Sequence, residues 1–158
     1  MRLTDILQSD CVKAPLAATD KQGAIHELVD VLAASIGLDD AQREDLKHAV
    51  WQREMTRTTG IGHGIGIPHG KAKGVSKLAM AVGKTAQPIE FGAIDRKPVE
   101  LIFLLASPVD QTGPHIQALA GISRMLTDAE FRNAIMQAAS AQEVFNLIEQ
   151  HDARQAAV

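Results

Sequence analysis

The segment Thr58-Thr-Gly-Ile-Gly-His-Gly-Ile-Gly-Ile-Pro-His-Gly-Lys71 alternates glycine with apolar residues and then places a histidine between proline and glycine. The isoleucines predict a short buried strand, and the glycines between them let the backbone approach its neighbours closely. Pro68 cannot continue a strand ladder, so we expect His69 to project from a rigid corner at a strand end, where binding and catalytic groups are often displayed. We expect Gly70 to keep the approach to this imidazole open.

Two nucleotide-binding motifs fail on spacing in this segment. A phosphate-binding loop requires glycine, four residues and then Gly-Lys-Ser/Thr, but isoleucine stands at position 65 and Lys71 is followed by Ala72. The dinucleotide fingerprint G-x-G-x-x-G also fails, because no start within the segment places its third glycine correctly. The sequence therefore predicts no nucleotide pocket.

Composition excludes several classes of protein. The chain has 158 residues, for which we expect a single domain over 1–153 and a frayed tail over 154–158. A formal charge of −3 argues against nucleic-acid binding. An aromatic content of 3% argues against a surface on which the bases of single-stranded nucleic acid could stack. The single cysteine, Cys11, excludes an internal disulfide and a thiolate-rich metal site and fits a reducing compartment.

No segment has the pattern of a membrane span. The longest apolar run, 101–106, is far shorter than the ~20 residues that cross a bilayer, and the amino terminus has no basic region followed by an apolar one. We therefore expect a soluble cytoplasmic protein.

Helical spacing of apolar residues precedes the glycine segment. It predicts one helix from an Asp20 cap to Gly37 and a second from Asp39 or Asp40 to about Met55.

The pattern then becomes extended. Short apolar runs separated by glycine, proline or charge predict strands at Ile65–Ile67, Leu78–Val82, Ile89–Phe91 and Val99–Ala106. The last of these runs is apolar on both alternating sides, which is typical of a central strand covered on both faces. Ligands gather where such strands end, so the following loop to His115 should carry function.

The remaining chain is predicted to be helical. Pro114 suits the first turn of a helix whose buried positions are Ile116, Leu119, Ala120, Ile122 and Leu126. The capping boxes Thr127-x-x-Glu130 and Ser140-x-x-Glu143 predict two further helices.

Three residues are candidates for chemistry, each with an alternative interpretation. His69 is either a nucleophile or a loop residue hydrogen-bonded to the backbone. His115 either reaches across to His69 or is a solvated residue at a helix start. Arg53 either offers its planar fork of donors to a phosphoryl group or is a surface charge at a helix end. A metal site formed by His63, His69 and His115 is a further alternative, although no ligand spacing supports it.

The glycine segment, with Arg53-Glu54 before it and Pro98-Val-Glu-Leu-Ile-Phe-Leu-Leu-Ala106 after it, resembles a known family. It is similar to the enzyme IIA domain of the fructose/mannitol/nitrogen-regulatory class of the bacterial phosphotransferase system, over nearly the whole chain. The resemblance implies an α/β fold, a three-layer sandwich with a mixed β-sheet flanked by helices on both faces.

The resemblance also implies roles for individual residues. His69, in the Ile-Pro-His-Gly motif, would accept a phosphoryl group from the histidine-containing phosphocarrier protein. His115 would hold the phosphoryl oxygens, and Arg53 would stabilise their charge. Such a phosphotransferase needs no cofactor, metal or nucleotide.

Two positions depart from the family pattern. His63 stands where the family usually has asparagine, and Gly66 where it usually has alanine. These departures leave open whether His63 adds a third imidazole to the cleft and whether the strand before Pro68 is looser than usual.

The family offers two functions. One is a regulator that signals through its phosphorylation state to a downstream target, and the other is a transport subunit that passes phosphate to the IIB component of a sugar permease. The segment Pro108–Thr112 resembles the nitrogen-regulatory branch and favours the regulator. A degenerate binding module is a third alternative, against which the presence of Arg53, His69 and His115 argues.

Overall fold

The computed structural model describes residues 1–156. The helices and strands of this part of the chain follow one another in the order η1 (Leu3–Asp5), β1 (Leu7–Leu16), α1 (Lys21–Ile36), α2 (Asp40–Thr56), β2 (Gly60–Gly62), β3 (Ile65–Gly66), β4 (His69–Lys71), β5 (Ala79–Ile89), β6 (Val99–Ser107), α3 (Thr112–Leu126), α4 (Ala129–Met136) and α5 (Ala141–Ala156). No helix among these residues is both long and apolar enough to cross a membrane.

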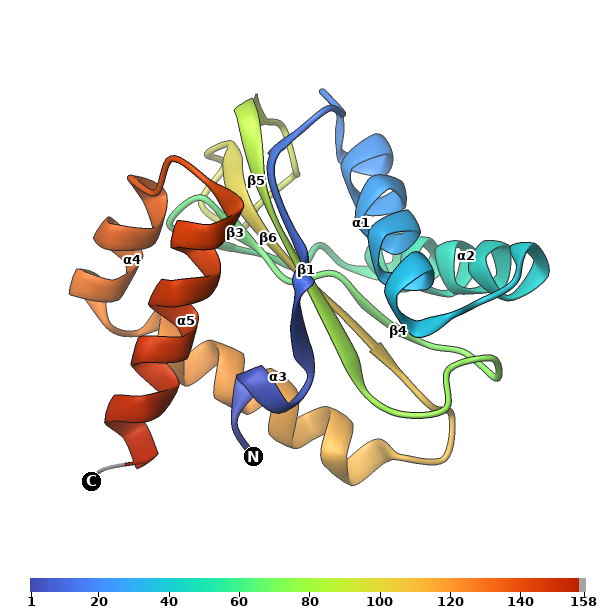
Figure 1. Cartoon of the computed structure of the whole chain (residues 1–158). Coiled ribbons are helices and arrows are strands. Elements are labelled where there is room, and N and C mark those ends of the chain that lie inside the picture. Colours follow the sequence, from blue (N-terminus) through green and yellow to red (C-terminus); the bar gives the residue numbers. More distant parts are fainter. Residues whose placement is uncertain (157–158) are drawn as a thin grey trace.

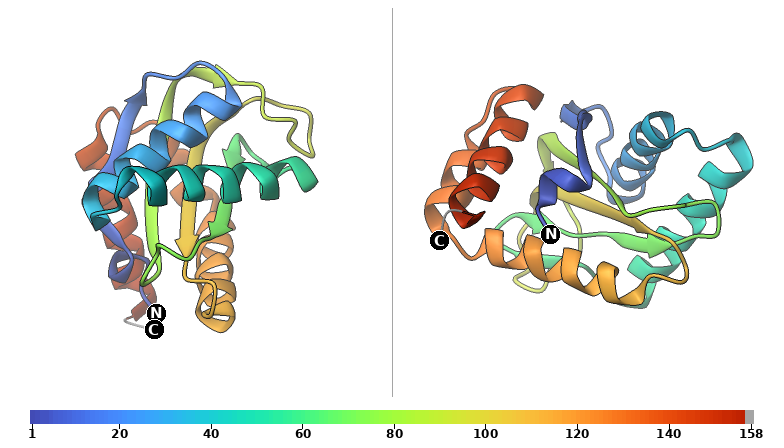
Figure 2. Two further views of the ribbon diagram at one scale, coloured as in Figure 1. Left: turned by 90° about the vertical axis from the view of Figure 1, so that its right-hand side faces the viewer. Right: turned by 60° about the horizontal axis from the view of Figure 1, so that its bottom comes forward.

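The strands form one mixed sheet between two layers of helices. Its order is β1-β5-β6-β3-β2, with β4 also paired to β6. β5 is antiparallel to β6, whereas β3 and β4 are parallel to it and β1 is parallel to β5. α1 and α2 cover one face, and α3, α4 and α5 lie on the other side (Figures 1 and 2). The predicted three-layer α/β sandwich is confirmed.

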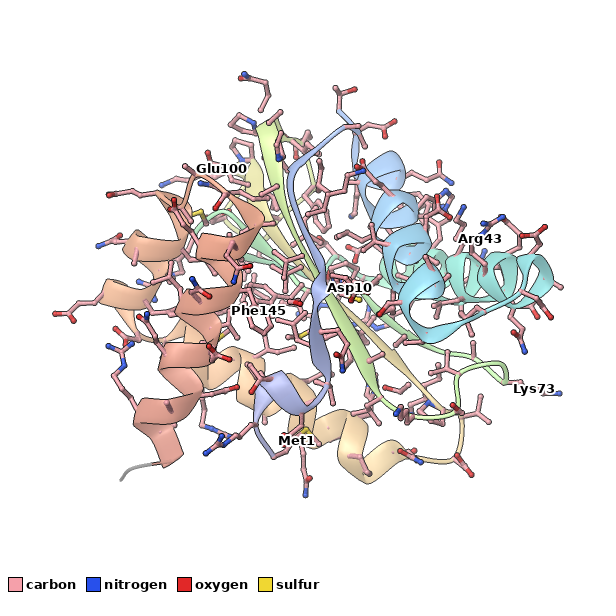
Figure 3. The ribbon with its side chains drawn as sticks, in the orientation of Figure 1. Met1, Asp10, Arg43, Lys73, Glu100 and Phe145 are labelled. Carbon is pink, nitrogen blue, oxygen red and sulfur yellow. The ribbon has the colours of Figure 1, made fainter. Side chains whose placement is uncertain are left out.

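The strand β6 is central to the sheet, as the sequence predicts. Every residue of 101–106 is fully buried, because helices cover both faces of this strand. Side chains fill the space between the layers (Figure 3). Phe145 of α5, for example, packs from one helical layer against the core.

The first two helices begin and end as their caps predict. The Asp20 carboxylate accepts a hydrogen bond from the N–H of Gly23, and Gly37 ends α1 in the left-handed conformation with φ of 75°. Asp39, rather than Asp40, caps α2, and its side chain accepts from the N–H of Gln42.

The strand prediction is wrong at three places. It lacks the short strands β2 and β4. The runs 78–82 and 89–91 are not separate strands, because one strand, β5, continues from Ala79 to Ile89. The strand β1 is absent from the prediction. It lies at the edge of the sheet, and its polar residues Gln8, Ser9 and Asp10 remain exposed, which removes the apolar pattern that would reveal it.

The helices after β6 form with three differences from the prediction. Ile116 is not buried but 59% exposed, and Leu119 and Ala120 are only partly buried. Asp128, rather than Thr127, caps α4, because the Thr127 hydroxyl instead donates to the carbonyl of Arg124. The tail expected to fray from residue 154 continues α5 to Ala156, and residues 157–158 lie outside the described residues.

Candidate active site

His69 is the first residue of β4 and is fixed there by the central strand. It pairs in parallel register with Leu105, whose N–H donates to the carbonyl of Pro68 at 3.1 Å. Nδ1 of the imidazole lies 2.8 Å from the carbonyl oxygen of Ile67. Because a carbonyl can only accept, Nδ1 must carry the hydrogen, and the neutral ring keeps its lone pair on Nε2. The hydrogen bond to the backbone that the loop-residue interpretation of His69 expects is therefore present. It uses Nδ1 and leaves Nε2 available.

Gly70 has a role different from the one expected. It is buried, and a Cβ built on it would lie 2.9 Å from Cγ2 and 3.0 Å from the backbone nitrogen of Val50. The expectation that Gly70 keeps the approach to His69 open is wrong. Its missing side chain instead lets α2 pack directly against the backbone of β4.

This packing brings Arg53 to the site. Arg53 lies almost one helical turn after Val50 and lines a pocket of about 330 Å³ together with His69. One guanidinium nitrogen donates to the carbonyl of Arg57 at 2.8 Å, which orients the side chain at the end of α2. The apolar part of the pocket wall includes Ile67.

Glu54, adjacent to Arg53, is a site-supporting residue that the sequence reasoning did not assign. Its buried carboxylate accepts from the N–H of Thr59 at 2.8 Å and pairs with the ammonium of Lys21 at 2.9 Å. Glu54 lies shortly before the glycine segment in the sequence. Nothing in the sequence showed, however, that the carboxylate would turn inward.

His115 lies in the first turn of α3 and faces His69. It is only 7% exposed, so the alternative of a solvated histidine is wrong. The ring centroids of His69 and His115 are 5.4 Å apart, with the planes inclined at 61°. Nδ1 of His115 lies 2.6 Å from the hydroxyl oxygen of Ser107, the last residue of β6.

Both imidazoles are held neutral near pH 7. Burial, with contributions from His69 and Lys71, lowers the pKa of His115 from 6.5 to about 4. Burial also lowers the pKa of His69, and the positive charge of Arg53 lowers this pKa further. The hydrogen bond to the carbonyl of Ile67 raises the pKa but does not cancel the effect of burial. Lys71 is itself positioned by donating to the hydroxyl of Thr112 at 3.0 Å. The site therefore offers uncharged imidazoles beside cationic side chains.

His63 does not join the cleft. It is exposed in the tight turn between β2 and β3, with φ of 58°, and its N–H donates to the carboxylate of Asp95 at 3.2 Å. Ile65, two residues later, pairs with Leu101, whereas His69 pairs with Leu105 farther along β6. The three-histidine metal alternative therefore has no geometric basis, and no group of three metal-binding side chains occurs within 1–156.

Gly66 does not loosen the strand before Pro68. A Cβ built on Gly66 would lie 2.8 Å from the ring of Phe91, which is almost completely buried. The aromatic ring fills the space where a methyl group would stand, so this glycine is a packing requirement.

Comparison with known proteins places this geometry in a family. The pattern of the family described as "Phosphoenolpyruvate-dependent sugar phosphotransferase system, EIIA 2" matches residues 5–151. The fructose-specific EIIA component of Haloferax volcanii is 38% identical over 128 residues, covering 81% of this chain and 82% of that protein. The nitrogen regulatory protein of Escherichia coli is 32% identical over 151 residues, covering 94% and 90%.

A third relative is much longer than this chain. The fructose-specific EIIABC component of Bacillus subtilis is 32% identical over 152 residues, which are 96% of this chain but only 24% of that protein.

Solved structures agree with the fold. The nitrogen regulatory protein IIA-Ntr of Neisseria meningitidis superposes with a TM-score of 0.82 at 30% identity, covering 91% of this chain and 97% of that one. The mannitol IIA protein of Escherichia coli shares the fold with a TM-score of 0.73 at 22% identity, covering 89% and 97%. This chain therefore belongs to the EIIA type 2 family of the phosphoenolpyruvate-dependent sugar phosphotransferase system.

Proposed function

We propose that His69 accepts a phosphoryl group on Nε2 from the histidine-containing phosphocarrier protein. The observation that carries this proposal is the bond from Nδ1 to the carbonyl of Ile67, which leaves Nε2 as the nucleophilic nitrogen in a pocket lined by Arg53. The lowered pKa of His69 supports it, because the reactive neutral form then dominates at neutral pH.

The transfer step uses the side chains already described. The lone pair on Nε2 of His69 attacks the phosphorus of the donor phosphohistidine in line, so that a new N–P bond forms while the donor N–P bond breaks. The donor imidazole leaves with the bonding electron pair. Arg53 faces the phosphoryl oxygens with paired N–H donors, and His115 orients them without forming a covalent bond.

We infer that the protein is a regulator whose output is its phosphorylation state. Support comes from the segment Pro108–Thr112 and from the structural likeness to the nitrogen regulatory protein of Neisseria meningitidis. A phosphate adds about −1.5 to −2 charges, enough to change which protein docks on this face. The second candidate is a transport subunit that delivers phosphate to a IIB component, which the 38% identity to the Haloferax fructose-specific EIIA component favours.

A labelling experiment tests the transfer itself. Phosphoenolpyruvate and the two upstream carrier proteins should place one acid-labile, base-stable phosphate on His69, and ATP alone should place none. His63→Ala is the matched control, because His63 is exposed and lies outside the pocket. Labelling should survive in that variant and vanish in His69→Ala. Label that persists in His69→Ala would refute the assignment.

A second experiment separates regulation from transport. Pull-downs with His69→Ala and His69→Asp, the latter an approximate charge mimic, should recover different proteins that are not permease subunits. If both forms bind only a permease subunit, and the phosphorylated protein passes its phosphate to that subunit and on to sugar, the transport function is correct and the regulatory one is wrong.

A further inference from the structure

We infer that Ser107 is a positioning residue that holds His115 in the tautomer with its hydrogen on Nε2. The inference about the tautomer concerns the unphosphorylated protein. Its consequence for phosphoryl transfer rests on the function proposed for His69.

The contact between the two residues is short and fully enclosed. Ser107 is 0% exposed and His115 is 7% exposed, and the hydroxyl oxygen lies 2.6 Å from Nδ1. The two residues face each other because the loop after β6 turns directly into α3. Water is excluded from the Ser107 hydroxyl, so this group has to satisfy its hydrogen-bonding capacity within the protein.

The direction of this hydrogen bond follows from the requirement that the buried Ser107 hydroxyl hydrogen has an acceptor. Within residues 1–156, the Ser107 hydroxyl makes no hydrogen bond other than the one to His115. If Nδ1 donated, the hydroxyl hydrogen would be buried without an acceptor, which is costly. If the hydroxyl donates instead, its hydrogen is satisfied and Nδ1 accepts with its lone pair. A neutral His115 then carries its own hydrogen on Nε2.

The two histidines of the site are thus held in opposite tautomers by opposite kinds of partner. The carbonyl of Ile67 can only accept, so the lone pair of His69 is on Nε2. The hydroxyl of Ser107 donates, so the lone pair of His115 is on Nδ1 and is already engaged. Only His69 is left with a free nucleophilic nitrogen, while Nε2 of His115 is a hydrogen-bond donor suited to phosphoryl oxygens, which only accept.

The tautomer can be measured directly in the protein without any phosphate donor. Long-range ¹H–¹⁵N correlation spectra of the ¹⁵N-labelled protein at pH 7 should show a protonated Nε2 and an unprotonated, hydrogen-bonded Nδ1 for His115. His69 should show the reverse pattern. A spectrum with the hydrogen of His115 on Nδ1 would overturn the inference, whether or not His69 is ever phosphorylated.

Variants at position 107 test whether the Ser107 hydroxyl sets the tautomer of His115. Ser107→Ala should give a mixture of tautomers at His115 and slow phosphoryl transfer about tenfold, the effect expected from losing one orienting hydrogen bond. Ser107→Thr retains the hydroxyl and should restore both the single tautomer and the rate. An unchanged His115 spectrum in Ser107→Ala would show that the serine does not set the tautomer. If Ser107→Ala fails to fold, the wild-type and Ser107→Thr spectra still show whether His115 carries its hydrogen on Nε2 when a hydroxyl is present at position 107.

Discussion

The carboxylate of Glu54 accepts hydrogen bonds from both donors of Thr59, from its N–H at 2.8 Å and from its hydroxyl at 2.5 Å. Glu54 ends the buried face of α2, and Thr59 immediately precedes the first glycine strand. The ammonium of Lys21, at the start of α1, completes the group at 2.9 Å from the same carboxylate. One buried charge therefore joins two helices to the segment that carries His69.

Removing this carboxylate should destabilise the protein strongly. Glu54→Ala leaves the partly buried Lys21 ammonium without its counter-charge, a kind of change that typically costs about 3–5 kcal/mol. Urea unfolding provides the measurement. Glu44→Ala on the same helix removes only ion pairs with Arg43 and Lys47 in which the carboxylate is exposed, and should cost less than about 1 kcal/mol. Equal losses of unfolding free energy in the two variants would mean that the buried carboxylate of Glu54 stabilises the fold no more than an exposed one.

Adding a methyl group at Gly70 should damage stability and transfer together. Gly70→Ala forces α2 away from β4 at Val50, and Arg53 moves with the helix, so we expect a loss of about 1–3 kcal/mol and slower phosphorylation of His69. Gly113→Ala is the control for stability, because open space surrounds that position in the first turn of α3. Wild-type unfolding and wild-type transfer in Gly70→Ala would disprove the role of this contact.

The guanidinium of Arg53 should not be replaceable by an ammonium. Arg53→Lys retains the charge but loses the planar fork of donors, so phosphoryl transfer should slow by at least tenfold. Arg43→Lys, near the start of α2 and therefore far from Arg53 along the helix, should leave the rate unchanged. Rapid-quench transfer rates, with thermal unfolding as a check of folding, provide the comparison. A wild-type rate for Arg53→Lys would return Arg53 to the surface-charge interpretation.

The lowered pKa of His115 predicts a dependence of stability on pH. The unfolded chain binds a proton at this residue near pH 6.5, whereas the folded chain binds it only near pH 4. Between these values the unfolded state holds more protons, so this contribution to the unfolding free energy falls as the pH is lowered from 6.5 to 4 and is constant above 7. His115→Gln should reduce the slope measured by urea unfolding over this range. An unchanged slope would contradict the shift.

Elements with a strong local pattern could be predicted from the sequence. The buried run of β6 and the capped ends of α1 needed no knowledge of the rest of the fold. The edge strand β1 could not be predicted, because its polar side chains point to solvent and hide its periodicity. Ile116 was misplaced because helical spacing gives the period of burial but does not show which side of α3 meets the sheet.

The sequence named candidate residues for the site but not the contacts that support them. Gly66 was expected to let another segment approach the backbone closely, whereas Gly70 was expected to leave open space. That the neighbours are Phe91 and Val50 depends on how distant segments pack. Ser107 and Glu54 gave no signal for the same reason, since a hydroxyl or a carboxylate acquires its partner only when the chain closes on itself.

The ladder between β4 and β6 has a consequence for how partners meet this protein. His69 pairs with Leu105, and Lys71 pairs with Ser107, the residue that contacts His115. Both imidazoles are thus positioned by contacts with the same interior strand, β6. A displacement of β6 would therefore move the two rings together. Their spacing is established when the chain folds, so under the proposed function a donor protein would meet a preformed site.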